Sequence, residues 1–396
     1  MPLKKFTLKS QVVTNLFLGG SAPRSTEEGE TGVIELRPPS FRGALRYWLR
    51  ALLGGVYGDS PAGRALVAQQ EALVFGSTEN ESGGAGSVGL RIGNANITKT
   101  TFHRDQIGTN YLLWSMAAFG NALPRYYIEA DSTFDLILSL RPGQPEQSLR
   151  LAVAALWLLT NLGGVGSRSR RTAGSFSPLE TVSYDGLSFN MPGTTLQEIS
   201  DYLQQGLKTI RGWVGAPAIS FSAFSEFDIL HPQSCRIWIL GIWDKAKEAV
   251  EEIGATFRAS RSYTNPDHDR VLAWLSSGVA IPTVTRSIYG LPIPYQYSRG
   301  GPAAIIQGVH FLPDDDNKEF DRRSSPLWLK VVRTESGYVG IATLFKSRFL
   351  PSRAMLYAKD VKRSSAEPGA INPPADYRLI EDWIKDNWDA QEVIYA

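Results

Sequence analysis

The loop of residues 163–176 constrains the fold of this chain more than any other segment, because a helix runs directly into it. Residues 145–164, "PEQSLRLAVAALWLLTNLGG", have the apolar pattern of a helix, and a strand is predicted near 179–189. A dinucleotide-binding loop has the reverse order, with a strand before its glycines and a helix after them. A P-loop needs G-x-x-x-x-G-K-[ST], and no lysine occurs in "GGVGSRSRRTAGSF". Both of these phosphate-binding folds are excluded.

The composition of the loop indicates a phosphate-rich ligand. Glycine loses more conformational freedom on folding than any other residue, and the loop holds four: Gly163, Gly164, Gly166 and Gly174. Its three arginines repel one another and need a partner: Arg168, Arg170 and Arg171. A guanidinium binds phosphate with paired hydrogen bonds and stacks on bases. We therefore expect the glycines to let the backbone approach an extended polyanion, with RNA the first candidate.

The order of elements predicts an α+β protein. In the first half the predicted order is β-α-β-β-α-β, which is the ferredoxin-like (RRM-like) order. Its strands are expected at 5–19, after the flexible loop within 81–97, at 132–140 and near 179–189, and its helices at 41–55 and 145–164. The second half can be read in the same way, with strands at 235–243, 326–333 and 337–347 and helices at 244–257, 265–277 and 374–390. We predict two tandem ferredoxin-like domains with insertions, residues 1–225 and 226–396.

The helix after Ser40 carries a basic stripe. Ser40 is the expected N-cap, and Gly54–Gly55 the expected end. Spacing of four residues places its arginines on one face: Arg42, Arg46 and Arg50. A solvated helix face normally has acidic partners one turn away, and no Asp or Glu occurs between Arg37 and Arg50. We favour an anion-binding face over a solvated one.

The overall composition indicates an intracellular protein. The net charge is only +2, so a basic site must come from local segregation of charge. Cys235 is the only cysteine, which excludes an intrachain disulfide and fits a reducing compartment. The N-terminus lacks the apolar core of a signal peptide, and the longest apolar helix is too short to span a bilayer. We expect a soluble cytoplasmic protein without a membrane partner.

Several segments together resemble the RAMP superfamily of CRISPR proteins, and within it the first subunit of the type III-B Cmr effector complexes. They are "LFLGG", "ELRPPSFRGALRYWLRAL" and "GGVGSRSRRTAGSF", with "YGLPIPY" and "RRSSPLWLKV" in the second half. The resemblance implies two RAMP domains in a ribonucleoprotein for antiviral defence. It implies an RNA-binding subunit near the 3′ region of the guide CRISPR RNA that helps to capture target RNA beside other RAMP subunits. Cleavage of the target is expected in those other subunits.

The resemblance also implies which residues bind RNA. Ser40, Arg42, Arg46 and Arg50 match the helix that lines the family's RNA groove, and Gly166, Arg168, Ser169, Arg170 and Arg171 match its glycine-rich loop. Arg322 and Arg323 lie in the matching block of the second half, where a charged turn is the alternative. Tyr295 and Tyr297 are a candidate stacking pair, and Arg299–Gly301 a weaker second site. Thr172–Ala173 depart from the family's usual glycine and aromatic residue, so base stacking is not expected there.

The sequence indicates no catalytic residue, metal or cofactor. The four histidines include His103, in a predicted surface loop, and His268, between Asp267 and Asp269 at a predicted helix start. Asp314, Asp315 and Asp316 are consecutive, whereas oxygen ligands of a metal are usually spaced. Two alternatives stay open. One is an endoribonuclease acting on CRISPR RNA through His103 or the Asp267–Asp269 cluster, and the other is a structural cap whose arginines meet acidic proteins.

Overall fold

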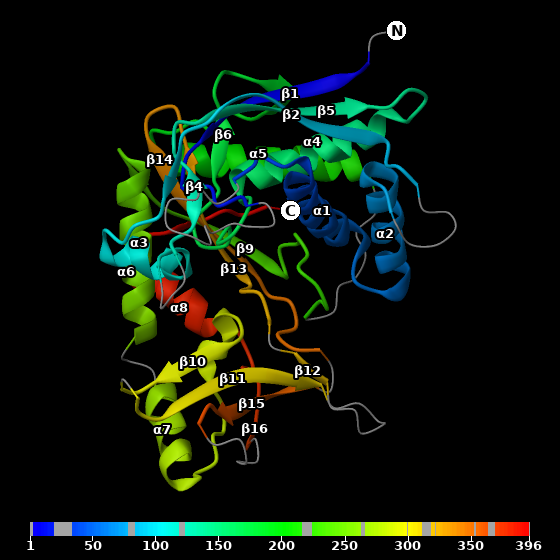
Figure 1. Cartoon of the computed structure of the whole chain (residues 1–396). Coiled ribbons are helices and arrows are strands. Elements are labelled where there is room, and N and C mark those ends of the chain that lie inside the picture. The colour runs from blue at the N-terminus through cyan, green and yellow to red at the C-terminus, as the bar shows by residue number, and fades with distance from the viewer. Residues whose placement is uncertain are drawn as a thin grey trace. The chain divides into compact units, whose positions relative to one another are not determined.

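The computed structural model describes residues 3–19, 34–77, 84–118, 123–215, 224–262, 266–298, 300–310, 318–320, 322–351, 354–362 and 369–395. The chain forms two compact units (Figure 1). The larger unit comprises Met1–Ala255, Trp328–Phe345 and Asp389–Ala396. The smaller unit comprises Thr256–Leu327 and Lys346–Trp388.

The first sheet of the larger unit is antiparallel and has the strand order β2-β5-β1-β6. Its strands are β1 (Lys5–Val12), β2 (Val88–Asn96), β5 (Thr133–Leu140) and β6 (Phe176–Pro178). The chain order of these strands and their helices is β1, α1 (Pro38–Tyr57), β2, β5, α4 (Glu146–Asn161), β6, with α2 (Pro61–Phe75) after α1. Two short antiparallel strand pairs lie outside this sheet: β3 (Lys99–Thr101) with β4 (Tyr126–Ile128), and the hairpin of β7 (Ser183–Tyr184) with β8 (Leu187–Ser188).

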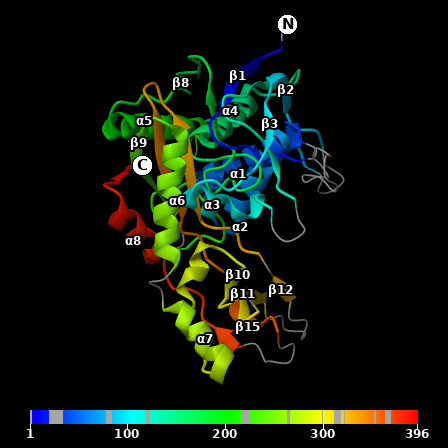
Figure 2. The same ribbon diagram turned by 60° about the vertical axis from the view of Figure 1, so that its left-hand side comes forward.

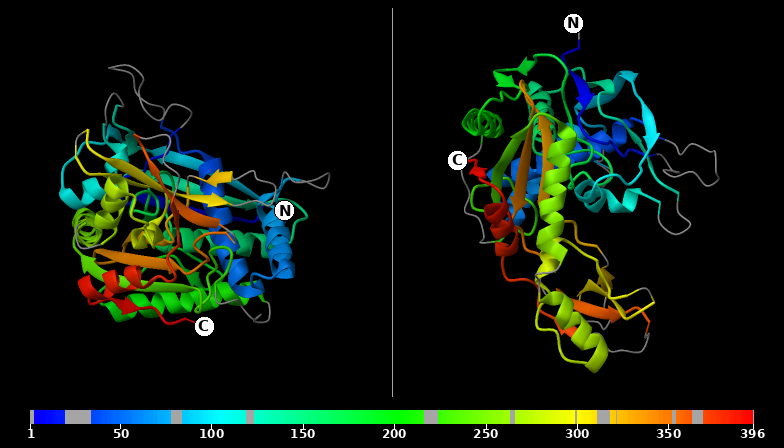
Figure 3. Two further views of the ribbon diagram at one scale, coloured as in Figure 1. Left: turned by 90° about the horizontal axis from the view of Figure 1, so that it is seen from below. Right: turned by 90° about the vertical axis from the view of Figure 1, so that its left-hand side faces the viewer.

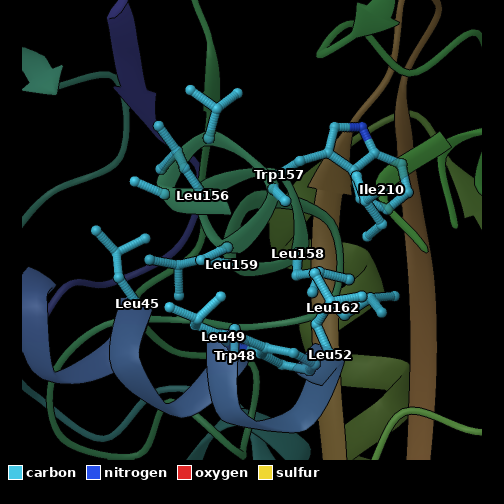
Figure 4. Close-up of a cluster of buried hydrophobic side chains, with 14 of the residues drawn as sticks. Leu45, Trp48, Leu49, Leu52, Leu156, Trp157, Leu158, Leu159, Leu162 and Ile210 are labelled. Atoms are coloured by element: carbon cyan, nitrogen blue, oxygen red, sulfur yellow. The ribbon is translucent and has the colours of Figure 1, made fainter. Parts of the chain in front are cut away.

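Helices α1 and α4 pack together and form the centre of the core. Leu45, Leu49 and Leu52 of α1 meet Leu156, Leu159 and Leu162 at α4, and Ile210 of α5 (Leu196–Val214) lies at the same cluster (Figure 4). All of these side chains are fully buried. Helix α5 begins with a capping box between Thr195 and Glu198.

The second sheet of the larger unit comes from the second half of the chain and has the order β13-β14-β9-β17. Its strands are β9 (Cys235–Trp243), β13 (Leu327–Arg333), β14 (Tyr338–Phe345) and β17 (Gln391–Glu392). The first turns of α6 (Ala246–Ser262) lie along this sheet (Figure 3), and they also lie beside α3 (Ile107–Leu113) and its extension η1 (Trp114–Met116) (Figure 2). Side chains of both sheets share one hydrophobic core.

The smaller unit is built around a third sheet of order β10-β11-β15-β16, with β12 also paired to β11. Its strands are β10 (Ile293–Gln296), β11 (Ala303–His310), β12 (Lys318–Phe320), β15 (Ala354–Asp360) and β16 (Gly369–Ile371). Its helices are α7 (Asp267–Ser277), η2 (Thr285–Tyr289) and α8 (Arg378–Asn387).

Two predicted helix boundaries are wrong. Helix α1 begins at Pro38 with Arg37 as its N-cap, so Ser40 lies inside the first turn. The helix continues through Gly54–Gly55 to Tyr57 because tertiary packing requires these glycines. A Cβ atom on Gly55 would lie 2.1 Å from the carbonyl oxygen of Leu230.

The predicted position of the strand after the loop is also wrong. It is Phe176–Pro178, at the end of the loop itself, and residues near 179–189 form the β7–β8 hairpin instead. Residues after 225 contribute to both compact units. The domain boundary at 225 and the second RAMP-like domain at 226–396 stay predictions.

Candidate nucleic-acid interface

The loop of residues 163–176 is held along one side by the segment that follows β1. The backbone of Val13 donates to Ser175 O at 2.8 Å, Gly174 donates to Asn15 O at 2.9 Å, and Ser167 donates to Phe17 O at 3.0 Å. These bonds fix the loop next to the first sheet over its whole length.

The other side of the loop is bonded to β13 of the second sheet. Thr172 N donates to Leu329 O at 2.9 Å, and Leu329 N donates to Arg170 O at 3.3 Å. Arg171 and Leu329 form a parallel bridge. The loop therefore joins the two sheets of the larger unit, although their strands are far apart in the sequence.

Internal packing explains the glycines of the loop. Gly166 and Gly174 have positive φ angles of 88° and 70°, which glycine adopts without strain. A Cβ atom on Gly174 would lie 1.9 Å from Val165 O, and one on Gly163 would lie 2.1 Å from Nε1 of Trp48. Gly163 and Gly174 are buried, so they serve contacts within the protein rather than approach to a ligand. Gly166 is exposed.

Arg170 points into an aromatic cluster. Its guanidinium lies 4.5 Å from the ring centre of Trp328 and 5.3 Å from that of Tyr47, and its Nη1 lies 3.7 Å from the buried carboxylate of Asp228. The Tyr47 hydroxyl donates to Asp228 at 2.7 Å and accepts from Trp328 Nε1 at 3.1 Å. Burial, and next the charge of Asp228, raise the pKa of Tyr47 well above its usual value. Arg170 thus completes a charge-balanced network.

Arg171 is turned inward as well. Its side chain is only 8% exposed, and its Nη1 donates to Arg170 O at 2.9 Å. Its backbone N–H closes a tight turn onto Arg168 O at 2.7 Å. Among the loop arginines, Arg168 is the one that lies at the solvent-facing part of the loop.

The solvent-facing part of the loop comprises Gly166, Ser167, Arg168 and Ser169. Arg168 has a positive φ of 63°, its Nε donates to Ser115 Oγ at 3.0 Å, and its guanidinium lies 5.8 Å from the ring centre of Trp114. The Trp114 side chain is 47% exposed. Nη1 of Arg125 donates to Ser167 Oγ at 3.0 Å. Trp114 and Arg125 were not predicted from the sequence, because no local pattern places a tryptophan or an arginine beside a loop that is distant in the chain.

The arginines of the basic stripe on α1 have an acidic partner on another helix, which was not predicted from the sequence. Glu71 of α2 is buried and accepts hydrogen bonds from Arg46 Nε and, at 3.2 Å, from Arg50 Nη1. The side of α1 that meets the loop carries Tyr47 and Trp48 instead. Arg42 is half-buried, and within the described part of the chain its buried Nε has no hydrogen-bond partner. Arg46 and Arg50 thus pair with α2, whereas the loop meets α1 at Tyr47 and Trp48.

A cavity of about 390 Å³ adjoins the inner side of the loop within the larger unit. Thr172 and Ala173 form one wall, and the remaining walls come from the end of β1, the segment around α3, the end of β4 and the start of α6. His103, one of the candidate catalytic residues, lines this cavity, and its Nε2 lies 2.8 Å from Thr101 Oγ1.

The candidate residues of the smaller unit have structural contacts. Asp267 is fully buried at the start of α7 and accepts from Thr285 Oγ1 at 3.0 Å and Arg286 N at 2.8 Å. Tyr295 is buried with the guanidinium of Arg286 over its ring, so it is not accessible for base stacking. Tyr297 packs against His268 with ring centres 4.4 Å apart. Arg323 Nε donates to Phe349 O at 2.9 Å, and Arg322 is exposed.

Some candidates lie outside the described residues, namely Arg299 and Asp314, Asp315 and Asp316. Within the described ranges, no group of three or more His, Cys, Asp or Glu side chains is arranged to hold a metal ion. No helix in the described part of the chain is long and apolar enough to cross a lipid bilayer.

Comparison with known proteins identifies the family. Residues 10–177, which include α1 and the loop, match the model of the RAMP superfamily. The CRISPR system Cmr subunit Cmr1-2 of Pyrococcus furiosus is 30% identical over 186 residues, which are 42% of this chain and 90% of that protein. The chain belongs to the Cmr1 family of the RAMP superfamily. The Cmr subunit Cmr1-1 of the same organism is 28% identical over 330 residues, 80% of this Cmr1-family chain and 82% of that protein.

Solved structures share the fold of this Cmr1-family chain. The crystal structure of Pyrococcus furiosus Cmr1 in its apo form has a TM-score of 0.59 at 19% identity and covers 100% of this chain and 99% of that one. A chain of the type III-B Cmr-beta complex bound to cognate target RNA has a TM-score of 0.50 at 12% identity, covering 97% of this chain and 98% of that one. These likenesses confirm a mixed α/β fold with antiparallel sheets.

Proposed function

We propose that this chain is a non-catalytic RNA-binding subunit of a type III-B Cmr effector complex. Its curated relatives are named as Cmr subunits, and one structure of similar fold belongs to a Cmr complex bound to target RNA. In that role it binds guide CRISPR RNA near its 3′ region, contacts neighbouring RAMP subunits and helps to capture target RNA.

The topology supports a pair of ferredoxin-like RAMP domains. The two four-stranded sheets of the larger unit have the same topology. When the strands of each sheet are numbered 1 to 4 along the chain, they lie side by side in the order 2-3-1-4. The second sheet draws all its strands from residues 226–396, as the proposed second domain requires. The smaller unit is then made largely of insertions, between α6 and β13 and between β14 and β17.

The solvent-facing part of the loop is the observation that carries the RNA-binding proposal. Arg168, exposed Gly166 and two half-buried serines lie at the surface with Arg125 and an exposed tryptophan, Trp114. Phosphate contacts come from arginine side chains, serine hydroxyls and backbone N–H groups, and exposed aromatic rings stack on unpaired bases. On this view Arg170 and Arg171 act as positioning residues that hold Arg168 outward. Ser169, Arg42 and Arg322 remain proposed contacts.

The test is binding of a fluorescently labelled single-stranded RNA to the full chain over a series of salt concentrations. Log affinity should fall linearly with log salt, with a slope of about −0.7 per phosphate contacted. Arg168→Ala should weaken binding for all sequences alike and flatten the slope. The matched control is Arg150→Ala, which removes an arginine of α4 that forms a surface ion pair with Asp185. An RNA that does not bind at low salt contradicts the proposal and favours a structural cap.

Endoribonuclease activity is a second candidate, because His103 lines a cavity that shares a wall with the loop. A lone histidine in such a cavity acts as a general base when its neutral form meets a ribose hydroxyl. The test is incubation of end-labelled CRISPR repeat RNA with the wild-type chain and with His103→Ala. Cleavage that the variant loses while it retains RNA binding supports this function, and intact RNA in both samples rules it out.

A further inference from the structure

The cavity beside the loop has the dimensions and walls of a site for one small planar molecule. Its volume of about 390 Å³ is within the range of small-ligand sites. Five separate segments of the larger unit close around it, so it exists only in the folded protein. All five segments contribute to its apolar lining, which consists of Val13, Phe102, Leu113, Ala130, Ala173 and Val250.

The charged groups of the lining do not favour phosphate inside the cavity. Asp105 and Lys247 form an exposed ion pair with each other, with their nitrogen and oxygen 2.5 Å apart. Glu129 adds a carboxylate that forms no ion pair with a lysine or arginine among the described residues. A cavity with an apolar lining and a net acidic set of charges suits an uncharged ligand that presents hydrogen-bond donors.

Three polar side chains of the lining have no hydrogen-bond partner among the described residues. They are the carboxamide of Asn15, the hydroxyl of Tyr127 and the carboxylate of Glu129. Glu129 lies close enough to Tyr127 that, after burial, its charge helps to raise the pKa of that hydroxyl. Thr14, by contrast, is committed to the loop, because its Oγ1 donates to Thr172 O and accepts from Ser175 N.

We propose that this cavity binds one unpaired guanine base of the RNA, an inference that rests on the proposed function and specifies its base preference. Guanine is the base that presents two adjacent N–H donors on its Watson–Crick edge, and a carboxylate accepts both. Glu129 supplies that carboxylate. The Asn15 carboxamide supplies a donor for the guanine carbonyl, and the ring of Tyr127 or Phe102 supplies an aromatic contact. The phosphate stays outside with the loop.

The experiment is titration of the full chain with guanosine, inosine and adenosine monophosphates, measured by calorimetry at a fixed salt concentration. The inosine nucleotide lacks only the 2-amino group, so it isolates one donor. We expect guanosine monophosphate to bind about tenfold or more tighter than the other two. Glu129→Gln should abolish that preference. Glu180→Gln, which removes an exposed carboxylate paired with Lys9, should leave it unchanged.

The outcomes separate this inference from the proposed function. Equal affinity for the three nucleotides, no binding of any, or a preference that survives in a folded Glu129→Gln variant overturns the guanine site. Salt-dependent RNA binding that is lost in Arg168→Ala would still support the proposed function in each of those cases. A guanosine preference in a chain that binds no RNA would overturn the proposed function and retain the guanine site. The same preference can be measured a second time by comparing the affinities of an RNA that contains guanosine and of the same RNA with inosine in its place.

Discussion

The guanidinium of Arg170 lies 4.5 Å from the ring centre of Trp328. One residue belongs to the loop between α4 and β6, and the other to β13 of the second sheet. This contact divides the loop arginines into an interior pair, Arg170 and Arg171, and an outward one, Arg168. Stability and RNA binding should therefore respond to different substitutions in the same short segment.

Arg170→Ala should lower the free energy of unfolding by about 2–4 kcal/mol, because it removes two cation–π contacts and the ion pair with the buried carboxylate of Asp228. Arg170→Lys should recover only part of this loss, since an ammonium lacks the planar face that stacks on Trp328. Urea unfolding measures both. The control Arg150→Ala breaks a surface pair and should change stability by no more than about 1 kcal/mol. A similarly small effect of Arg170→Ala would refute an interior role.

Arg168→Ala should leave stability nearly unchanged and weaken RNA binding. The side chain has a hydrogen bond to Ser115 and a contact with Trp114 at the surface. Loss of one phosphate contact should reduce the salt slope of log affinity by about 0.7. Anisotropy titrations at several salt concentrations measure the slope. An unchanged slope in the folded variant would assign the RNA contact elsewhere.

Gly174→Ala should lower the stability of the protein far more than Gly143→Ala does. Both glycines have positive φ, 70° and 75°. A Cβ atom on Gly174 would meet Val165 O at 1.9 Å, whereas one on Gly143 would have nothing within 4 Å. Gly143→Ala should cost about 1–2 kcal/mol from its backbone conformation alone, and Gly174→Ala about 3 kcal/mol or more. Thermal unfolding of the two variants compares them directly, and equal losses would show that the loop relaxes around Gly174.

Lys330 makes the stability of the larger unit depend on pH. Its side chain is 2% exposed, its Nζ lies 5.8 Å from the Phe176 ring centre, and that nitrogen has no hydrogen-bond partner among the described residues. Burial lowers the pKa of Lys330 from 10.5 to about 7. Between these values the unfolded chain holds a proton that the folded chain lacks. Raising the pH from 7 to 9.5 should therefore stabilise the protein by up to about 1.4 kcal/mol per unit.

Lys330→Met removes this titrating group while keeping a long apolar side chain. The variant should be more stable than the wild type at pH 7, and the difference should shrink as the pH rises towards 9.5. Other groups titrate equally in both proteins, so the difference between their urea-unfolding curves isolates Lys330. A constant difference across that pH range would mean that Lys330 keeps its proton in the folded state.

Arg46 and Arg42 on α1 should differ in the same way as Arg170 and Arg168. Arg46→Ala leaves the buried Glu71 with fewer donors and should cost about 1–3 kcal/mol of stability. Arg42→Ala breaks no described hydrogen bond of its buried Nε, so its measurable effect should be on RNA affinity. Paired unfolding and binding measurements on each variant check this. If Arg46→Ala strongly weakened RNA binding without lowering stability, Arg46 would instead be assigned to the RNA-binding surface.

Periodicity predicted most elements of both four-stranded sheets, because strands such as Cys235–Trp243 and helices such as Glu146–Asn161 carry their pattern locally. Periodicity failed to predict helix ends and side-chain directions that depend on contacts with residues distant in the sequence. Gly54–Gly55 indicated a helix end, but the backbone of Leu230 holds them inside the helix. Arg46 pairs with Glu71 and Arg170 with Asp228, and no spacing within either motif reveals these distant carboxylates. The cavity beside the loop was also beyond prediction, since five segments form it.

The hydrogen bond from Thr172 to Leu329 also bears on the order of events during synthesis. A ribosome releases the loop long before it releases β13, so a nascent chain has the arginines without the strand that turns two of them inward. The surface that we propose to bind RNA, with Arg168 in the solvent-facing part of the loop, can form only once the second sheet has been made. The loop therefore reaches its final hydrogen bonding only after most of the polypeptide has been synthesised.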